Sequence, residues 1–274
     1  MNSVSIPERI LASDRRIVVT GLVTMTLLAW LYLFTGAGMN MDMSQMISLA
    51  LIPKQSGMAV TSLVSWSINY IIIVALMWWI MMIAMMLPGA APTVLLYARV
   101  VRQSSGSQSF TVNASILCFV TGYLLVWLVF SLLATGLQWW LEQQQWISMH
   151  IASRNAFLSA AILFAVGLYQ LTPLKDACLR QCQAPAIFIV NHMKPGLFGA
   201  LRMGLAHGVF CLGCCVLLMT LLFVGGVMNM LWVAVLMLFI TAEKWLVNLR
   251  YLPGITGILL ILLAFMVLIL SAAA

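Results

Sequence analysis

The chain has 274 residues, of which 64% are hydrophobic and only 7% are charged. A water-soluble domain needs far more charge on its surface, so this composition excludes an ordinary soluble fold. The formal net charge of +7 does not indicate a nucleic-acid-binding protein, because the basic residues are scattered singly between apolar runs.

Long apolar runs predict helices that cross a membrane. Three of them, 70–87, 117–137 and 254–271, contain no Lys, Arg, Asp or Glu, and about 20 helical residues span the hydrocarbon core. The alternating pattern of a lipid-facing barrel is absent, and helices then satisfy the backbone in lipid. The predicted spans in chain order are 17–34, 70–87, 114–137, 156–171, 201–224, 227–247 and 254–271. We therefore expect an all-α, polytopic membrane helix bundle of about seven spans in a single domain.

The basic residues orient these spans. With the N-terminus in the cytoplasm, only Lys54 and Arg154 of the 13 Lys and Arg residues fall on the outer side. This asymmetry is the positive-inside pattern. It places a Met-rich loop, 36–69, outside and a Cys-containing loop, 172–200, inside. The first span resembles a signal peptide but is long for one, and we expect it to stay uncleaved.

The outer loop has an unusual concentration of methionine. Met39, Met41 and Met43 alternate around Asp42, and Met46 follows three residues later. Thioethers resist oxidation to disulfides and select soft monovalent metals, so this loop suits capture of Cu(I) or Ag(I). The alternative is a loop that dips into the membrane interface.

A second group of methionines lies on the second predicted span. Met77, Met81 and Met85 are spaced by four residues and share one helix face, and Met82 and Met86 form a parallel pair. Two thioethers on one face have the spacing to hold one soft ion, although ordinary core packing also explains the stripe. We expect the span to end at the Leu-Pro step of residues 87–88, which would free backbone carbonyls near the inner surface.

The fifth predicted span carries the densest set of soft ligands: Met203, His207, Cys211, Cys214 and Cys215. At 100° per residue the first four fall within an arc of about 80°, and Cys215 lies just beside it. Imidazole and thiols on one face have the chemistry of a soft-metal site, and an intramembrane His indicates function. The alternative is that Cys serves here as a small packing residue.

Two further thiols lie in the inner loop. Cys178 and Cys182 are four residues apart, so both face one way if the segment is helical, and neighbouring Lys and Arg residues favour thiolates. Palmitoylation is the competing interpretation. Glu243 is either a local surface partner of Lys244 or outer support for the His207 site. Every Cys lies on the inner side or within a span, so thioethers face outward and thiols inward.

Three blocks carry a resemblance to a known family: residues 79–92, 169–182 and 204–219. In this order they resemble the bacterial family of predicted metal-binding integral membrane proteins, a domain of unknown function. The resemblance covers roughly residues 70–250. It implies a bacterial inner-membrane protein that binds metal through the Cys and His residues of these blocks, and it supplies no established reaction.

The resulting hypothesis is copper handling: binding of a soft ion, Cu(I) before zinc, for uptake or for delivery to a copper-dependent membrane or periplasmic protein. One alternative is a subunit of a copper-dependent membrane oxidase, which a single nearby His disfavours because catalytic copper usually has nitrogen and oxygen ligands. A structural membrane protein without metal is another. No catalytic residues are predicted, nucleic acid is not an expected partner, and the metal, direction of transfer and oligomeric state stay open.

Overall fold

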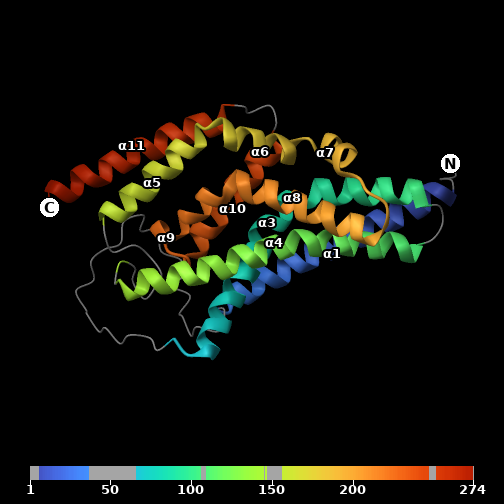
Figure 1. The fold of residues 1–274 in the computed structure, drawn as a ribbon, viewed down its shortest axis with the longest axis horizontal. Helices are drawn as coiled ribbons and strands as arrows, with labels where there is room; N and C mark the ends of the chain where they lie inside the picture. The colour runs from blue at the N-terminus through green and yellow to red at the C-terminus, as the bar shows by residue number, and fades with distance from the viewer. Residues whose placement is uncertain are drawn as a thin grey trace, which may run out of the picture.

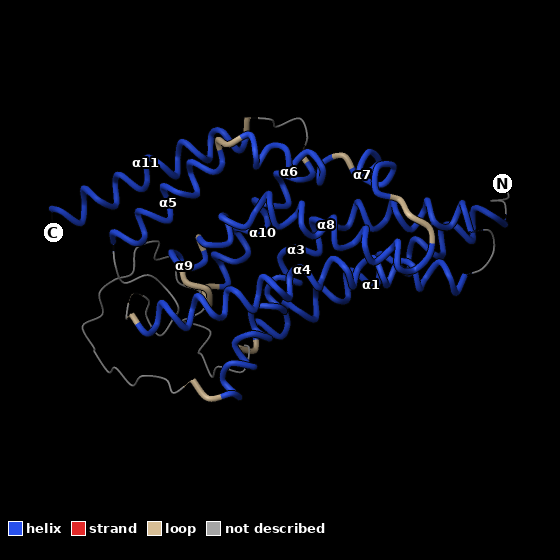
Figure 2. Tube along the Cα trace, in the orientation of Figure 1, coloured by secondary structure: helices blue, strands red, loops and turns tan. Residues whose placement is uncertain are grey.

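The computed structural model describes residues 6–36, 66–105, 109–144, 146, 156–246 and 251–273. Within these ranges all regular structure is helical, which confirms the all-α prediction (Figure 2). The helices are α1 (Ile6–Phe34), α3 (Ile68–Ser105), α4 (Ser109–Gln143), α5 (Ala156–Gln170), α6 (Pro173–Gln183), α7 (Pro185–His192), α8 (Gly196–Thr220), α9 (Leu222–Gly225), α10 (Met230–Trp245) and α11 (Leu252–Ala273).

Five of the described helices are long and apolar enough to cross a membrane: α1, α3, α4, α8 and α11. A sixth span is formed if α5 and α6, which are bent by 65° at their junction, are counted together. The prediction of seven spans is therefore not confirmed. The region 227–247 differs because its helix, α10, begins only after the cap Asn229 and has 16 residues, or about 24 Å of a core about 30 Å thick.

Helix α3 runs through both prolines that were expected to end it. It has 38 residues and contains Pro88 and Pro92 in its interior, so the predicted break after residue 87 is wrong. Proline removes one backbone donor and costs about 3 kcal/mol in an isolated helix, but packed neighbours offset that cost inside a bundle. The Tyr123 hydroxyl of α4 contacts the same part of α3, donating to the carbonyl of Met86 at 3.0 Å.

Glycines allow the closest helix contacts. A Cβ at Gly204 of α8 would overlap the backbone of Phe119 in α4, and a Cβ at Gly208 would lie 2.8 Å from Val126. The pair α5 and α11, which lies beside the rest of the bundle in Figure 1, uses Gly167 in the same way, with Gly257 O 2.8 Å from its Cβ position. Small residues at crossings are the usual means of helix association where lipid replaces water.

The core positions the candidate site. One buried cluster joins the methionines of α3 to the cysteines of α8 and to α10, and a second lies between α3, α4, α7 and the beginning of α8. By contrast, α1 and α11 expose many apolar side chains, among them Leu27, Leu31, Ile258 and Leu262. An apolar exterior of this kind matches lipid as the surrounding medium.

Candidate metal centre

Four buried thiols converge from two helices. Cys211, Cys214 and Cys215 lie on α8, and Cys182 lies at the end of α6; all are 8% exposed or less. The Cys182 thiol lies beside the thiols of Cys211 and Cys214, and Cys215 lies beside Cys211. We call these four residues the thiol cluster. Cysteines separated by about 30 residues in the sequence thus meet at one place.

Helix α6 is held in position by specific contacts. Thr172 caps its N-terminus, with its hydroxyl accepting from the Lys175 amide at 3.3 Å, and a proline occupies the first turn, where its missing donor costs nothing. At the other end, Gln183 donates to the backbone carbonyl of Glu243 in α10 at 2.7 Å. The neighbouring Cys182 is therefore oriented toward α8 rather than toward the surrounding medium.

Helix geometry organises the thiols on α8. Cys214 and Cys215 both donate to the carbonyl of Cys211, at 3.1 and 2.8 Å. These back-bonds satisfy buried thiol protons within the helix. The sulfur of Cys211 also receives contacts from polar side chains of other helices.

Two groups on other helices reach Cys211 Sγ. The ammonium of Lys244 in α10 lies 2.9 Å away, and the hydroxyl of Tyr123 in α4 lies 3.1 Å away. Both side chains are buried. Sequence analysis did not assign either residue to the site. The signal that could have identified Lys244 is the presence of a Lys near the end of an apolar helix.

His207 lies one turn before Cys211 and is 2% exposed. Its ring is surrounded by aromatic rings, with centroids 6.0 Å from Phe119, 5.6 Å from Tyr123 and 5.0 Å from Phe188. Its Nδ1 atom has no hydrogen-bond partner among the described residues. A buried imidazole nitrogen without a partner is costly.

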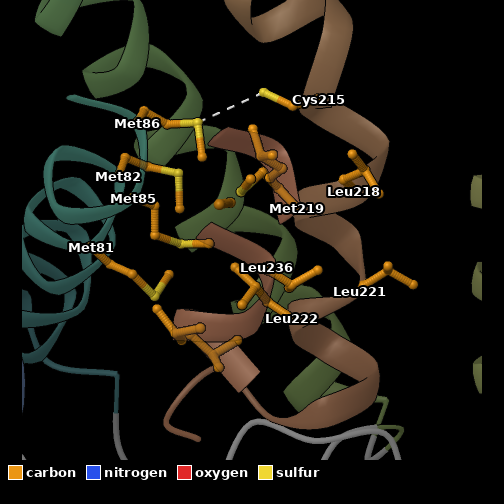
Figure 3. Packing of buried hydrophobic residues seen from close by; sticks show 14 of the residues in the cluster. Met81, Met82, Met85, Met86, Cys215, Leu218, Met219, Leu221, Leu222 and Leu236 are labelled. Atoms are coloured by element: carbon orange, nitrogen blue, oxygen red, sulfur yellow. Dashed lines mark hydrogen bonds between the residues drawn. The ribbon is translucent and has the colours of Figure 1, made fainter. Parts of the chain in front are cut away.

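Methionines of α3 extend from the thiol cluster. Cys215 donates to the sulfur of Met86 at 3.8 Å, and Figure 3 shows Met81, Met82 and Met85 following Met86 along α3, with side chains directed toward the region of Met219. All of these α3 methionines are 1% exposed or less. The predicted methionines are thus buried in one cluster with α8 and α10, and we call four of them the methionine row (Met81, Met82, Met85, Met86).

The remaining predicted ligands are not members of the thiol cluster, although Cys178 lies near Cys214. Cys178 is partly exposed on α6, where its sulfur lies against Gly213. Met203 is buried one turn before His207, in the second hydrophobic cluster. Met39, Met41 and Met43 of the predicted outer loop lie outside the described residues.

Glu243 does not form the surface pair with Lys244 that one interpretation predicted. It is buried and accepts two contacts of 2.8 Å from the ammonium of Lys175 in α6, while Gln170 of α5 hydrogen-bonds to both members of the pair. Consecutive side chains on a helix point about 100° apart, so Glu243 faces α6 and Lys244 faces α8. The carboxylate therefore supports the helix that carries Cys182.

The arrangement is a set of sulfur ligands rather than a finished metal site. Among the described residues, no group of three or more His, Cys, Asp and Glu side chains is already arranged to hold a metal ion. Paired sulfurs from two helices, a neighbouring thioether and an imidazole are nevertheless the donors that a soft ion selects. The chemistry that these donors support is the binding and release of such an ion.

Comparison with known proteins identifies a family. Residues 75–267 match the PpoB2 family, described as copper chaperone. Neither the curated proteins nor the solved structures gave a match. The matched region contains the methionine row and all of the thiol cluster, and it overlaps the blocks that resemble a metal-binding family. Because the match covers more than half of its length, the chain belongs to the PpoB2 copper chaperone family.

Proposed function

We propose that this protein is a membrane-spanning copper chaperone that holds Cu(I) at the thiol cluster and passes it to a copper-dependent membrane or periplasmic protein. The observation that carries the proposal is the meeting of Cys182 from α6 with Cys211 and Cys214 from α8. Membership of a copper chaperone family supports copper as the cargo.

The ligand chemistry favours the monovalent state of copper. Thiolates and thioethers are soft donors that prefer Cu(I), whereas Cu(II) prefers nitrogen and oxygen ligands in a square arrangement. Four thiols and the Met86 thioether surround the proposed position, and a single imidazole, that of His207, is near. Reduced thiols suit a compartment such as the cytoplasm, which the basic residues assign to this end of the bundle.

The methionine row supplies a route away from the thiols. Thioethers are neutral at every pH, so they bind Cu(I) more weakly than thiolates and release it more readily. Successive thioethers along α3 (Figure 3) would let an ion move between sites of similar affinity, as conduction through a row of weak sites requires. In the proposed orientation this row leads from the thiol cluster toward the outer side, where the loop with Met39, Met41 and Met43 is expected.

The test is Cu(I) binding by the full-length protein in detergent, measured anaerobically by competition with a chromogenic Cu(I) chelator. The double variant Cys211→Ala/Cys214→Ala is expected to lose affinity by about a hundredfold or more, since even outer partners of metal ligands contribute 10- to 100-fold. Cys118→Ala is the matched control, because Cys118 lies on α4 among residues of the second hydrophobic cluster. Unchanged Cu(I) affinity in the double variant would refute the proposal.

A further inference from the structure

Lys244 is a buried cation without a carboxylate of its own. It is 4% exposed, and the neighbouring carboxylate, Glu243, is engaged by Lys175. Removing an ammonium from water is costly unless an anion or several acceptors replace the water. Within the described part of the chain, the group that meets this ammonium is the sulfur of Cys211, at 2.9 Å.

The fold makes room for the lysine at this position. Its side chain crosses Gly89, where an added Cβ would lie 3.1 Å from Lys244 Cδ and 3.4 Å from Nζ. Gly89 belongs to the proline-containing segment of α3 that the Tyr123 hydroxyl also contacts through the carbonyl of Met86. The ammonium is therefore held among α3, α4 and α8, beside the sulfur that has contacts from three helices.

We propose that Lys244 is a specificity-determining residue that makes the thiol cluster select a monovalent cargo over a divalent one. The inference rests on the proposed function and adds the rule by which the ion is chosen. A monovalent ion held by two thiolates carries a net charge of −1, which the ammonium neutralises. A divalent ion on the same two thiolates is already neutral, so the ammonium leaves an uncompensated positive charge in a buried site.

The size of the effect follows from the geometry. A metal ion bound to Cys211 Sγ would lie about 4 Å from the ammonium, where one additional unit of positive charge changes the binding constant by about a thousandfold at an effective dielectric constant of about 20. Reorganisation and residual water reduce this value. The ratio of monovalent to divalent affinity is therefore expected to fall by roughly a hundredfold to a thousandfold when the ammonium is removed.

The experiment measures the affinities of the full-length protein in detergent for Cu(I), Ag(I) and Zn(II) under anaerobic conditions. Lys244→Met removes the charge with similar volume, Lys244→Gln is a second neutral variant that retains a donor, and Lys244→Arg restores the charge. Arg180→Met is the matched control, because it removes an exposed cation from α6, the helix that carries Cys182.

Both neutral variants are expected to lower the ratios of Cu(I) affinity and of Ag(I) affinity to Zn(II) affinity. Lys244→Arg is expected to keep most of the preference for monovalent ions, and Arg180→Met is expected to leave that preference unchanged. A ratio of two affinities measured on the folded fraction does not change with a general loss of stability. If Lys244 had a purely structural role, its variants would therefore keep the wild-type affinity ratio. Neutral variants with the wild-type ratio would overturn the inference while leaving the proposed function standing. A wild-type protein that does not bind Cu(I) would instead refute the proposed function.

Discussion

The buried pair of Lys175 and Glu243 is expected to contribute to the copper site by holding α6 against α10. Both side chains are 2% exposed or less, and both carboxylate oxygens lie 2.8 Å from the ammonium. At that separation two unit charges attract by about 6 kcal/mol at an effective dielectric constant of about 20. The loss of water from both ions cancels most of this attraction.

Removing one partner should therefore be much worse than removing both. Lys175→Met or Glu243→Leu leaves an uncompensated buried charge and should destabilise the protein by about 3–5 kcal/mol, whereas the double variant should cost far less than the sum of the single changes. Because α6 carries Cys182, each single variant should also weaken Cu(I) binding, and the double variant should recover part of that loss.

The assay is unfolding of the detergent-solubilised protein followed by circular dichroism, combined with the Cu(I) competition titration. Arg180→Ala breaks the exposed pair with Asp176 on the same helix and should change stability by less than about 1 kcal/mol. Single variants as stable as the wild type, or a double variant as unstable as the two single changes added together, would show that the pair does not anchor α6 in this way.

Three further outcomes are expected. Cys182→Ser should reduce Cu(I) affinity at least tenfold more than Cys178→Ser in the same titration, because only Cys182 reaches the sulfurs of both Cys211 and Cys214; equal effects would contradict the site geometry. Met86→Leu conserves volume and should cost less than about 1.5 kcal/mol of stability. It should slow Cu(I) transfer to an added acceptor several-fold, as measured by stopped-flow. An unchanged transfer rate would argue against the methionine row as a route. Gly204→Ala should destabilise the contact of α8 with α4 by about 1–3 kcal/mol. Gly136→Ala, which has open space around its Cβ position, should be neutral or stabilising by up to about 1 kcal/mol. Thermal unfolding distinguishes the two variants, and similar midpoints would contradict the close packing of α8 against α4.

Local rules failed at the prolines of α3. Pro88 and Pro92 favour a helix end when neighbouring residues alone are considered, because each removes an i to i−4 hydrogen bond. The helix nevertheless continues to Ser105, with Tyr123 of α4 and Lys244 of α10 packed against this segment. Contacts with residues 37 and 155 positions away are invisible to any local pattern.

In the candidate site, too, some features follow from the local sequence pattern and others do not. Helical periodicity correctly grouped His207 and the cysteines of α8 on a buried face, and it grouped the methionines of α3 on another. It did not indicate that Cys182 joins the thiol cluster and Cys178 does not, nor that Glu243 turns away from Lys244. Those outcomes depend on the bend between α5 and α6 and on the rotation of α10.

By itself, then, the amino-acid sequence determined the helical class, the apolar character of the long helices and the soft-ligand chemistry of their buried faces, since each follows from composition and from a period of 3.6 residues. Only the tertiary structure decided which sulfurs meet, that the ammonium of Lys244 lies 2.9 Å from Cys211 Sγ, and that Lys175 neutralises Glu243. The physical reason is that a helix face specifies what it presents, whereas the partner that it meets depends on how whole helices pack against one another.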